Sequence, residues 1–85
     1  MTLHLDRVEV ECYSGYKADE RPTTFTYRGK RREIVEIVDR WYEGSRDPQE
    51  AGLDYFKVRT RRGGEYILRR SRLFDGWGIL IRDTE

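Results

Sequence analysis

The sequence predicts an all-β domain in which five or six short antiparallel strands form a small curled sheet or an SH3-like barrel. Apolar and polar residues alternate in several segments, β-branched and aromatic residues are frequent in them, and glycine-containing turn signals separate them. Closure of the sheet is favoured over a sandwich because it hides the strand edges. We expect a single domain over residues 1–85, because no repeat, linker or low-complexity segment interrupts the chain.

The first strand is predicted over residues 5–12. Val8, Val10 and Cys12 fall on one face of it and two glutamates fall on the other, as in a strand with one buried face. Residues 14–22 follow as a predicted loop.

The first hairpin is predicted around Gly29-Lys30, because a type II′ turn requires glycine at its first central position. The facing pairs in that register are Phe25 with Ile34 and Tyr27 with Arg32. Both aromatic rings, and Arg32 with them, would then project toward the core.

Residues 34–42 fit two patterns, since the apolar positions 34, 37, 38 and 41 also form a helical stripe. We predict a strand, because β-branched residues dominate and the hairpin leads directly into the segment. A bulge near Val35-Glu36 would restore the alternation of Ile37, Asp39 and Trp41. Residues 43–52 are polar and are predicted to form an exposed loop.

A second hairpin is predicted from residues 55–61 and 65–70 around Gly63-Gly64. A two-residue turn would set charged residues opposite apolar ones, whereas a three-residue loop ending in a left-handed glycine avoids this. The preferred register pairs Val58 with Leu68, Thr60 with Tyr66, Arg61 with Glu65 and Lys57 with Arg69.

The last hairpin is predicted at Asp75-Gly76, a type I′ signal. This turn would place Phe74 opposite Trp77. Ile79 and Ile81 would then share the face of Tyr66 and Leu68.

The composition argues against several classes of function. Lys and Arg total 17 against 16 acidic residues, so no global basic field exists to drive non-specific nucleic-acid binding. Cys12 is the only cysteine, which excludes an internal disulfide. No apolar segment resembles a signal peptide or reaches membrane-spanning length, so we expect a cytoplasmic protein without membrane contact.

No catalytic set can be assembled from the sequence. His4 is the only histidine, so we expect neither a metal site nor a cysteine-histidine nucleophile, and Cys12 is expected to be a core thiol. Gly63-Gly64 lacks the lysine and hydroxyl residue of a phosphate loop. The sequence therefore predicts no enzyme activity, no cofactor and no metal.

The arginines and lysines are the remaining functional signal. They crowd both hairpin tips, in the runs 28–32 and 59–62. The predicted partner-binding residues are Tyr55, Lys57, Arg59, Arg61 and Arg69, which would combine stacking with phosphate contacts. The alternative, which we favour, is that a neighbouring carboxylate strand such as Glu9 to Glu11 neutralises these cations. We therefore expect a protein-interaction module, with nucleic-acid binding as the alternative.

Prolines, aromatic residues, glycines and a tryptophan form a recurrent pattern in the stretches 12–16, 20–22, 25–29, 38–41, 55–59 and 66–69. This pattern resembles a family of short bacterial all-β proteins of unassigned function. A similar domain of unknown function is associated with some bacterial proteins related to Y-family DNA polymerases, so the resemblance implies a role near DNA repair and no catalytic residues. The chain departs from the family pattern at Arg32 and Glu33, where an aromatic or apolar residue is common.

Overall fold

The computed structural model describes residues 2–14, 20–44, 52–71 and 76–83. The prediction of an all-β fold is confirmed, and no helix in the described ranges is long and apolar enough to cross a membrane. The strands are β1 (Thr2–Arg7), β2 (Glu9–Ser14), β3 (Glu20–Tyr27), β4 (Lys30–Glu43), β5 (Leu53–Thr60), β6 (Glu65–Ser71) and β7 (Gly76–Asp83).

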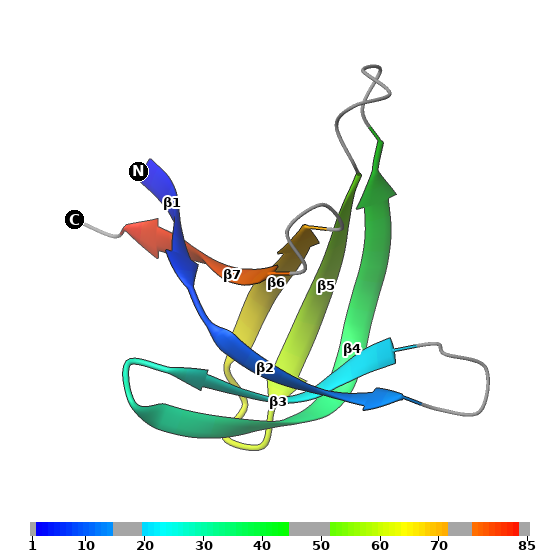
Figure 1. Cartoon of the computed structure of the whole chain (residues 1–85). Helices are drawn as coiled ribbons and strands as arrows, with labels where there is room; N and C mark the ends of the chain where they lie inside the picture. The colour runs from blue at the N-terminus through cyan, green and yellow to red at the C-terminus, as the bar shows by residue number, and fades with distance from the viewer. Residues whose placement is uncertain (1, 15–19, 45–51, 72–75, 84–85) are drawn as a thin grey trace.

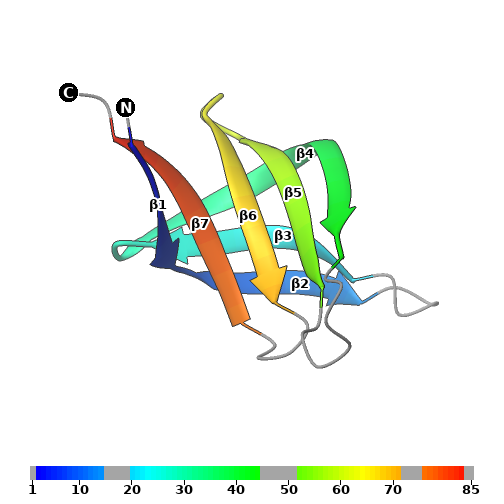
Figure 2. The same ribbon diagram turned by 90° about the horizontal axis from the view of Figure 1, so that it is seen from above.

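The strands form one antiparallel sheet in the order β1-β7-β6-β5-β4-β3-β2. The sheet curls into a half-barrel in which β2, β3 and the start of β4 run across β5, β6 and β7 (Figures 1 and 2). The predicted count of five or six strands is wrong because the segment predicted as one strand changes partner at Val8. β1 pairs with β7 and β2 pairs with β3, while the Val8 N–H donates to the Trp77 carbonyl oxygen at 3.3 Å.

The alternating pattern of this bent segment is confirmed. Val8 is buried and Val10 packs against the core, whereas Glu9 and Glu11 are exposed. The predicted loop over 14–22 is shorter than expected, because β2 reaches Ser14 and β3 begins at Glu20; residues 15–19 lie outside the described ranges. β3 thus includes Pro22, at a point where β4 does not yet pair with it, and an open strand edge tolerates proline.

The predicted type II′ turn of the first hairpin is wrong. The turn residues are Arg28 and Gly29, with φ of 52° and 77°, and two positive φ values are typical of a type I′ turn. Tyr27 consequently faces Lys30, and Phe25 faces Arg32 instead of Ile34. The register moves by two residues, so each side chain keeps its predicted face.

The strand prediction for residues 34–42 is confirmed, as is the bulge near Val35-Glu36, since the register of β4 against β5 shifts between Ile34 and Glu36. A second shift between Ile37 and Asp39 was not predicted. It reverses the faces of the following residues, so the predicted alternation of Ile37, Asp39 and Trp41 is wrong.

The consequence is an exchange of two side chains on β4. Arg40 pairs with buried Phe56 and places its guanidinium 4.9 Å from that ring. Trp41 pairs with Tyr55 on the outer face instead of entering the core. β4 also extends through Glu43, where the loop over 43–52 was expected to begin.

The loop of the second hairpin has three residues and ends in a left-handed glycine, as predicted, but it lies one residue earlier. Gly63 has φ of 93°, and the Thr60 N–H donates to the Gly64 carbonyl oxygen at 2.9 Å. The predicted pairs of this hairpin are therefore wrong. The observed pairs are Phe56 with Leu68, Val58 with Tyr66, Arg59 with Glu65, Lys57 with Ile67 and Tyr55 with Arg69.

The core lies between the two layers of the curled sheet. Ile79 faces Leu68, and Tyr66 and Ile81 pack against the same cluster, which confirms their predicted common face. Trp77 pairs with Arg70, and the predicted Phe74 and Asp75 lie outside the described ranges. The buried apolar side chains are Val8, Phe25, Phe56, Val58, Leu68 and Ile79.

We expect Gly29→Ala to lower the free energy of unfolding by about 1 kcal/mol, because alanine is disfavoured at positive φ. A Cβ at this position meets no atom within 4 Å, so the cost is conformational and not steric. Urea denaturation measures the loss. Gly29→Asn is the control and loses less, since asparagine tolerates this region; equal losses for the two variants would contradict the assignment.

We also expect the stability to fall at high pH through Tyr27. Its pKa is raised, first by the hydrogen bond that its hydroxyl donates to Asp6 at 2.7 Å and then by partial burial. Arg28 and His4 also lie near this carboxylate, at 3.7 and 3.9 Å. The stabilisation is complete below the ordinary tyrosine pKa of about 10 and is lost as pH rises through the higher folded-state pKa.

Urea denaturation from neutral pH to pH values above about 10 tests this linkage. Tyr27→Phe lacks the titrating hydroxyl, so its stability falls less steeply than that of the wild type in the alkaline range. Tyr13→Phe, at an exposed position of β2, retains the wild-type slope. Parallel slopes for the wild type and Tyr27→Phe would show that the hydrogen bond contributes nothing to the pH dependence.

Candidate functional site

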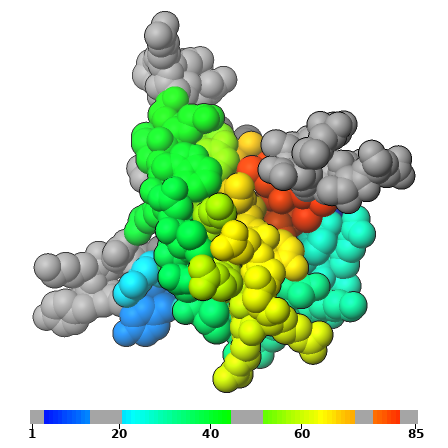
Figure 3. Space-filling model, turned by 180° about the vertical axis from the view of Figure 1, so that it is seen from behind, coloured from blue at the N-terminus to red at the C-terminus, as the bar shows by residue number. Residues whose placement is uncertain are grey.

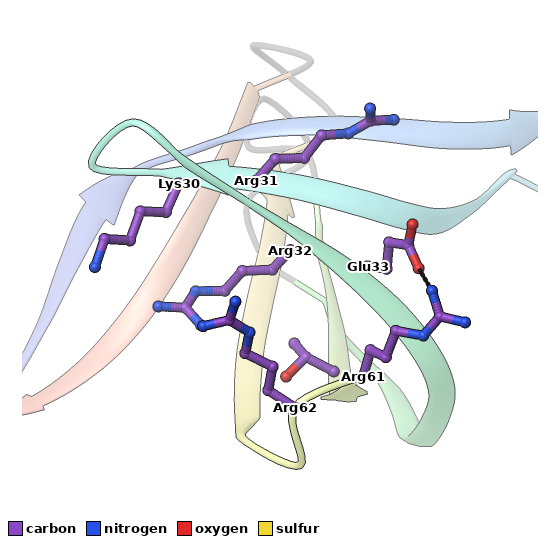
Figure 4. Close-up of a pocket in the computed structure, with 7 residues that line it drawn as sticks. Lys30, Arg31, Arg32, Glu33, Arg61 and Arg62 are labelled. Carbon is purple, nitrogen blue, oxygen red and sulfur yellow. Dashed lines mark hydrogen bonds and ion pairs between the residues drawn. The ribbon is translucent and has the colours of Figure 1, made fainter.

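A cavity of about 530 Å³ lies between the start of β4 and the loop that joins β5 to β6 (Figure 4). Five of its lining side chains are cationic and only one is a carboxylate. The lining residues are Lys30, Arg31, Arg32, Glu33, Thr60, Arg61 and Arg62.

The hairpin register and one loop contact assemble this cavity. The type I′ turn ends at Gly29, so the basic run enters β4 directly and faces the end of β3. The Arg61 N–H donates to the Glu33 carbonyl oxygen at 3.0 Å, which ties the β5–β6 loop to β4. Two basic runs about thirty residues apart in the chain are thereby brought to one place.

Two of the five cations have carboxylate partners. Arg61 Nη1 lies 3.0 Å from Glu33 Oε2 within the cavity lining. Arg31 Nη2 lies 3.3 Å from Glu11 Oε2, and Figure 4 shows this side chain turned away from the others toward β2. Exposed pairs of this kind contribute about 0–1 kcal/mol each, so they neutralise charge more than they stabilise the fold.

The other three cations, Lys30, Arg32 and Arg62, form no ion pair with any carboxylate in the described ranges. Arg32 places its guanidinium 5.5 Å from the Tyr66 ring, and its buried Nε has no hydrogen-bond partner. In Figure 4 the ends of Arg32 and Arg62 point toward one another. An anion between two such guanidiniums would offset their repulsion and accept their hydrogen bonds.

Arg32 thus lies on the core-facing side of its strand, as the sequence pattern predicted. Its guanidinium avoids the apolar interior by stacking at the end of the core on Tyr66, which in turn packs edge-on against Phe25 at 5.3 Å. The Tyr66 ring packs against the Arg32 side chain, and the outer edge of the guanidinium remains at the cavity.

The predicted partner-binding residues divide between two surfaces. Tyr55, Lys57, Arg59 and Arg69 share the outer face of β5 and β6, which Figure 3 shows from behind, whereas Arg61 lies at the cavity. We call the former group the outer face. The predicted like-charge pair of Lys57 with Arg69 is absent, because Lys57 faces Ile67.

Carboxylates on the adjoining strands neutralise much of the outer face. Arg59 lies 2.7 Å from Glu36 and 3.7 Å from Glu65, and Lys57 lies 3.9 Å from Glu65. A neighbouring strand thus supplies a carboxylate, as expected, but that strand is β4 with Glu36. The example given, the Glu9 to Glu11 strand, is wrong for this face, because Glu11 pairs with Arg31 of the first hairpin. The outer face consequently offers less uncompensated positive charge than the cavity does.

Sequence reasoning missed two features of these surfaces. The Trp41 ring stacks on the Tyr55 ring at 5.2 Å and 4°, a contact that depends on the second bulge of β4. In the sequence, Lys30, Arg32 and Arg62 appear only as members of basic runs at two hairpin tips. That repetition of charge was the available signal, but their meeting depends on the curl of the sheet.

Comparison of the chain with protein-family models, with curated proteins and with solved structures finds no match. The resemblance to the bacterial β family therefore stays a prediction. Within the described ranges, no group of three or more histidine, cysteine, aspartate or glutamate side chains is placed to hold a metal ion.

We expect Glu33→Gln to tighten the binding of pyrophosphate at the cavity about two- to fivefold, because the substitution releases Arg61 from its carboxylate. An NMR titration of the 15N-labelled protein measures the dissociation constant. Glu36→Gln is the matched control: it removes the same charge from β4 but releases Arg59 on the outer face. An equal gain in both variants would assign the effect to net charge and not to the cavity.

Proposed function

We propose that this protein is a non-enzymatic binding module that holds the phosphate backbone of a nucleic acid at the basic cavity. The observation that carries the proposal is the group of three cations, Lys30, Arg32 and Arg62, that converge on the cavity without carboxylate partners in the described ranges. We further propose that the half-barrel is an SH3-like barrel and that the protein acts in the cytoplasm.

The charge distribution supports a polyanionic ligand. The cavity lining carries five cations against one carboxylate, although the whole chain has a net charge of only +1. The remainder of the chain is therefore net acidic, and the positive charge is concentrated at one end of the half-barrel. Such a concentration attracts phosphates locally even when the net charge is small.

The hydrogen-bonding chemistry supports phosphate. A guanidinium presents a planar fork of donors that matches phosphate oxygens in a bidentate manner. The Arg32 Nε has no partner in the fold, and the Arg62 side chain extends from the loop toward it. Lys30 adds a third cation from the beginning of β4.

The extent of the surface favours a chain of phosphates over a single small anion. The cations belong to two separate hairpins and surround a cavity wide enough for more than one phosphate group. The resemblance to a domain associated with DNA-polymerase-related proteins points the same way. Thr60 is the one residue of the lining with a hydroxyl group. That hydroxyl donates a hydrogen bond to the Gly64 carbonyl oxygen at 3.3 Å, so its proton is engaged within the fold, which supports binding without catalysis.

We expect short oligonucleotides to bind with a strong salt dependence. Three phosphate contacts predict that affinity falls roughly 20- to 40-fold between about 50 and 200 mM salt. Arg62→Gln removes one phosphate contact, so it weakens binding to oligonucleotides of every base sequence. It also lowers the magnitude of the slope of log K against log salt by about 0.7–0.9. Fluorescence anisotropy with labelled single-stranded and duplex DNA measures both quantities.

Arg69→Gln is the matched control for this measurement. It removes the same charge from the outer face, where Arg69 forms no ion pair in the described ranges, and we expect the slope to remain unchanged. A larger effect of Arg69→Gln would move binding to the outer face. Tighter binding of poly-glutamate than of an oligonucleotide of equal charge would instead indicate an acidic protein partner.

A further inference from the structure

β4 has one open edge along its second half. Its residues 34–43 pair with β5, while its pairing with β3 ends at Glu33 (Figure 1). No other strand in the described ranges pairs with the opposite edge of this segment. The backbone N–H and C=O groups along such an edge are a template for an added strand.

The regular part of this edge follows the second bulge. From residue 39 to residue 43 each residue of β4 pairs with the next residue of β5, without a further shift of register. Bulges discourage strand addition over the earlier part, because they twist the edge and break its repeat. Any added strand is therefore expected on residues 38–43.

Large apolar side chains are exposed along the same segment. Trp41 is 39% exposed, Tyr42 is 53% exposed and Val38 is 38% exposed. Four of the six exposed large hydrophobic residues in the described ranges belong to β4. A concentration of this kind on one edge is typical of an interaction surface, whereas scattered exposed residues are ordinary.

Residues 38–43 carry two carboxylates and one cation, Arg40, whose guanidinium lies over the Phe56 ring on the core-facing side. Lys57 faces Asp39 across the strand pair, but its ammonium group lies 3.9 Å from Glu65.

Asp39 and Glu43 flank Trp41 at two residues on either side, so the three side chains share the outer face. Neither carboxylate forms an ion pair with a cation in the described ranges. Asp39 Oδ1 accepts a hydrogen bond from the Arg40 backbone N–H at 2.8 Å, a neutral donor that leaves the negative charge of the carboxylate uncompensated. Because Tyr55 stacks on one side of the Trp41 ring, the other side of the indole is turned toward the open edge.

We propose that the open edge of β4 binds an extended basic peptide as an added strand, with an arginine or lysine of the peptide over Trp41 and between Asp39 and Glu43. An indole face attracts a cation, and two flanking carboxylates strengthen that attraction. The backbone supplies the strand pairing, and the aromatic and acidic group supplies the selectivity.

The same charges disfavour the other occupants. Phosphates of a nucleic acid would be repelled by Asp39 and Glu43. A second copy paired through β4 about Trp41 would set Asp39 opposite Glu43, and like charges that face each other destabilise a sheet. The proposal does not depend on nucleic-acid binding at the cavity, which lies at the other end of β4.

The experiment titrates the 15N-labelled protein with a capped peptide of alternating threonine and valine that has one central arginine. We expect shifts in the amides of residues 38–43 and in the Trp41 indole N–H, and none in residues 30–32. A peptide with glutamate in place of arginine binds about tenfold more weakly. A peptide with prolines along one edge, which keeps the arginine but loses backbone donors, does not bind.

Two variants separate the edge from the cavity. The double variant Asp39→Asn, Glu43→Gln is expected to bind the arginine peptide about three- to tenfold more weakly. The control is Glu36→Gln: the Glu36 carboxylate pairs with Arg59, so its removal leaves peptide binding unchanged. Pyrophosphate binding at the cavity is expected to persist in all of these proteins. Equal binding of the arginine and proline peptides, or of the arginine and glutamate peptides, would overturn the proposal. A dimer in sedimentation that Trp41→Lys converts to a monomer would also overturn it, since a second copy would then occupy the edge.

Discussion

A single curled sheet must enclose the core from both sides, and the rest of the structure depends on this constraint. Two long segments satisfy this constraint because each pairs with one strand over its first part and with another strand over its second part. The first passes from β7 to β3 at Val8, and β4 passes from β3 to β5 after Glu33. Each change bends the sheet, so that Phe25 from one layer meets Val58 and Leu68 from the other in one cluster. Each fully buried side chain of this size contributes on the order of 1.5–3 kcal/mol.

The bend of β4 also determines where charge collects. It brings the first hairpin against the β5–β6 loop, so that Arg32 and Arg62 from distant parts of the chain meet at one end of the core. Tyr66 closes that end and supports Arg32 by a cation–π contact. The cavity is therefore a product of the same curvature that closes the core. Arg32 packs on an aromatic ring, whereas Arg31 and Arg61 pair with carboxylates.

The open edge of β4 follows from the same geometry. After Glu33, β4 no longer pairs with β3, so β5 is its neighbour on one side only. The open side carries Trp41 and its acidic neighbours. The two surfaces thus differ in chemistry because they lie on opposite sides of the partner change. Phosphate binding at the cavity and peptide addition at the edge are compatible in one molecule, since neither uses the residues of the other.

Much of the fold was accessible from the sequence, because strand faces depend on a local period of two. The inward positions of Val8, Phe25 and Arg32 and the bulge near Val35 all follow from alternation. Register was not accessible. The choice between Gly29-Lys30 and Arg28-Gly29 as the turn depends on the twist of the two strands in the finished sheet. The second bulge places Trp41 outside and Arg40 against Phe56, and it is defined only by the pairing of β4 with β5.

The basic runs at the hairpin tips were visible in the sequence, yet their convergence was not. Contacts such as Arg61 with Glu33 join residues that are remote in the chain, and only the curl of the sheet brings them together. The sequence by itself determined the all-β class, most strand positions and most of the side chains that face the core, but not those that follow the second bulge of β4. Tertiary structure decided the register, the partner changes and the grouping of charges, because these depend on long-range packing and not on any local pattern.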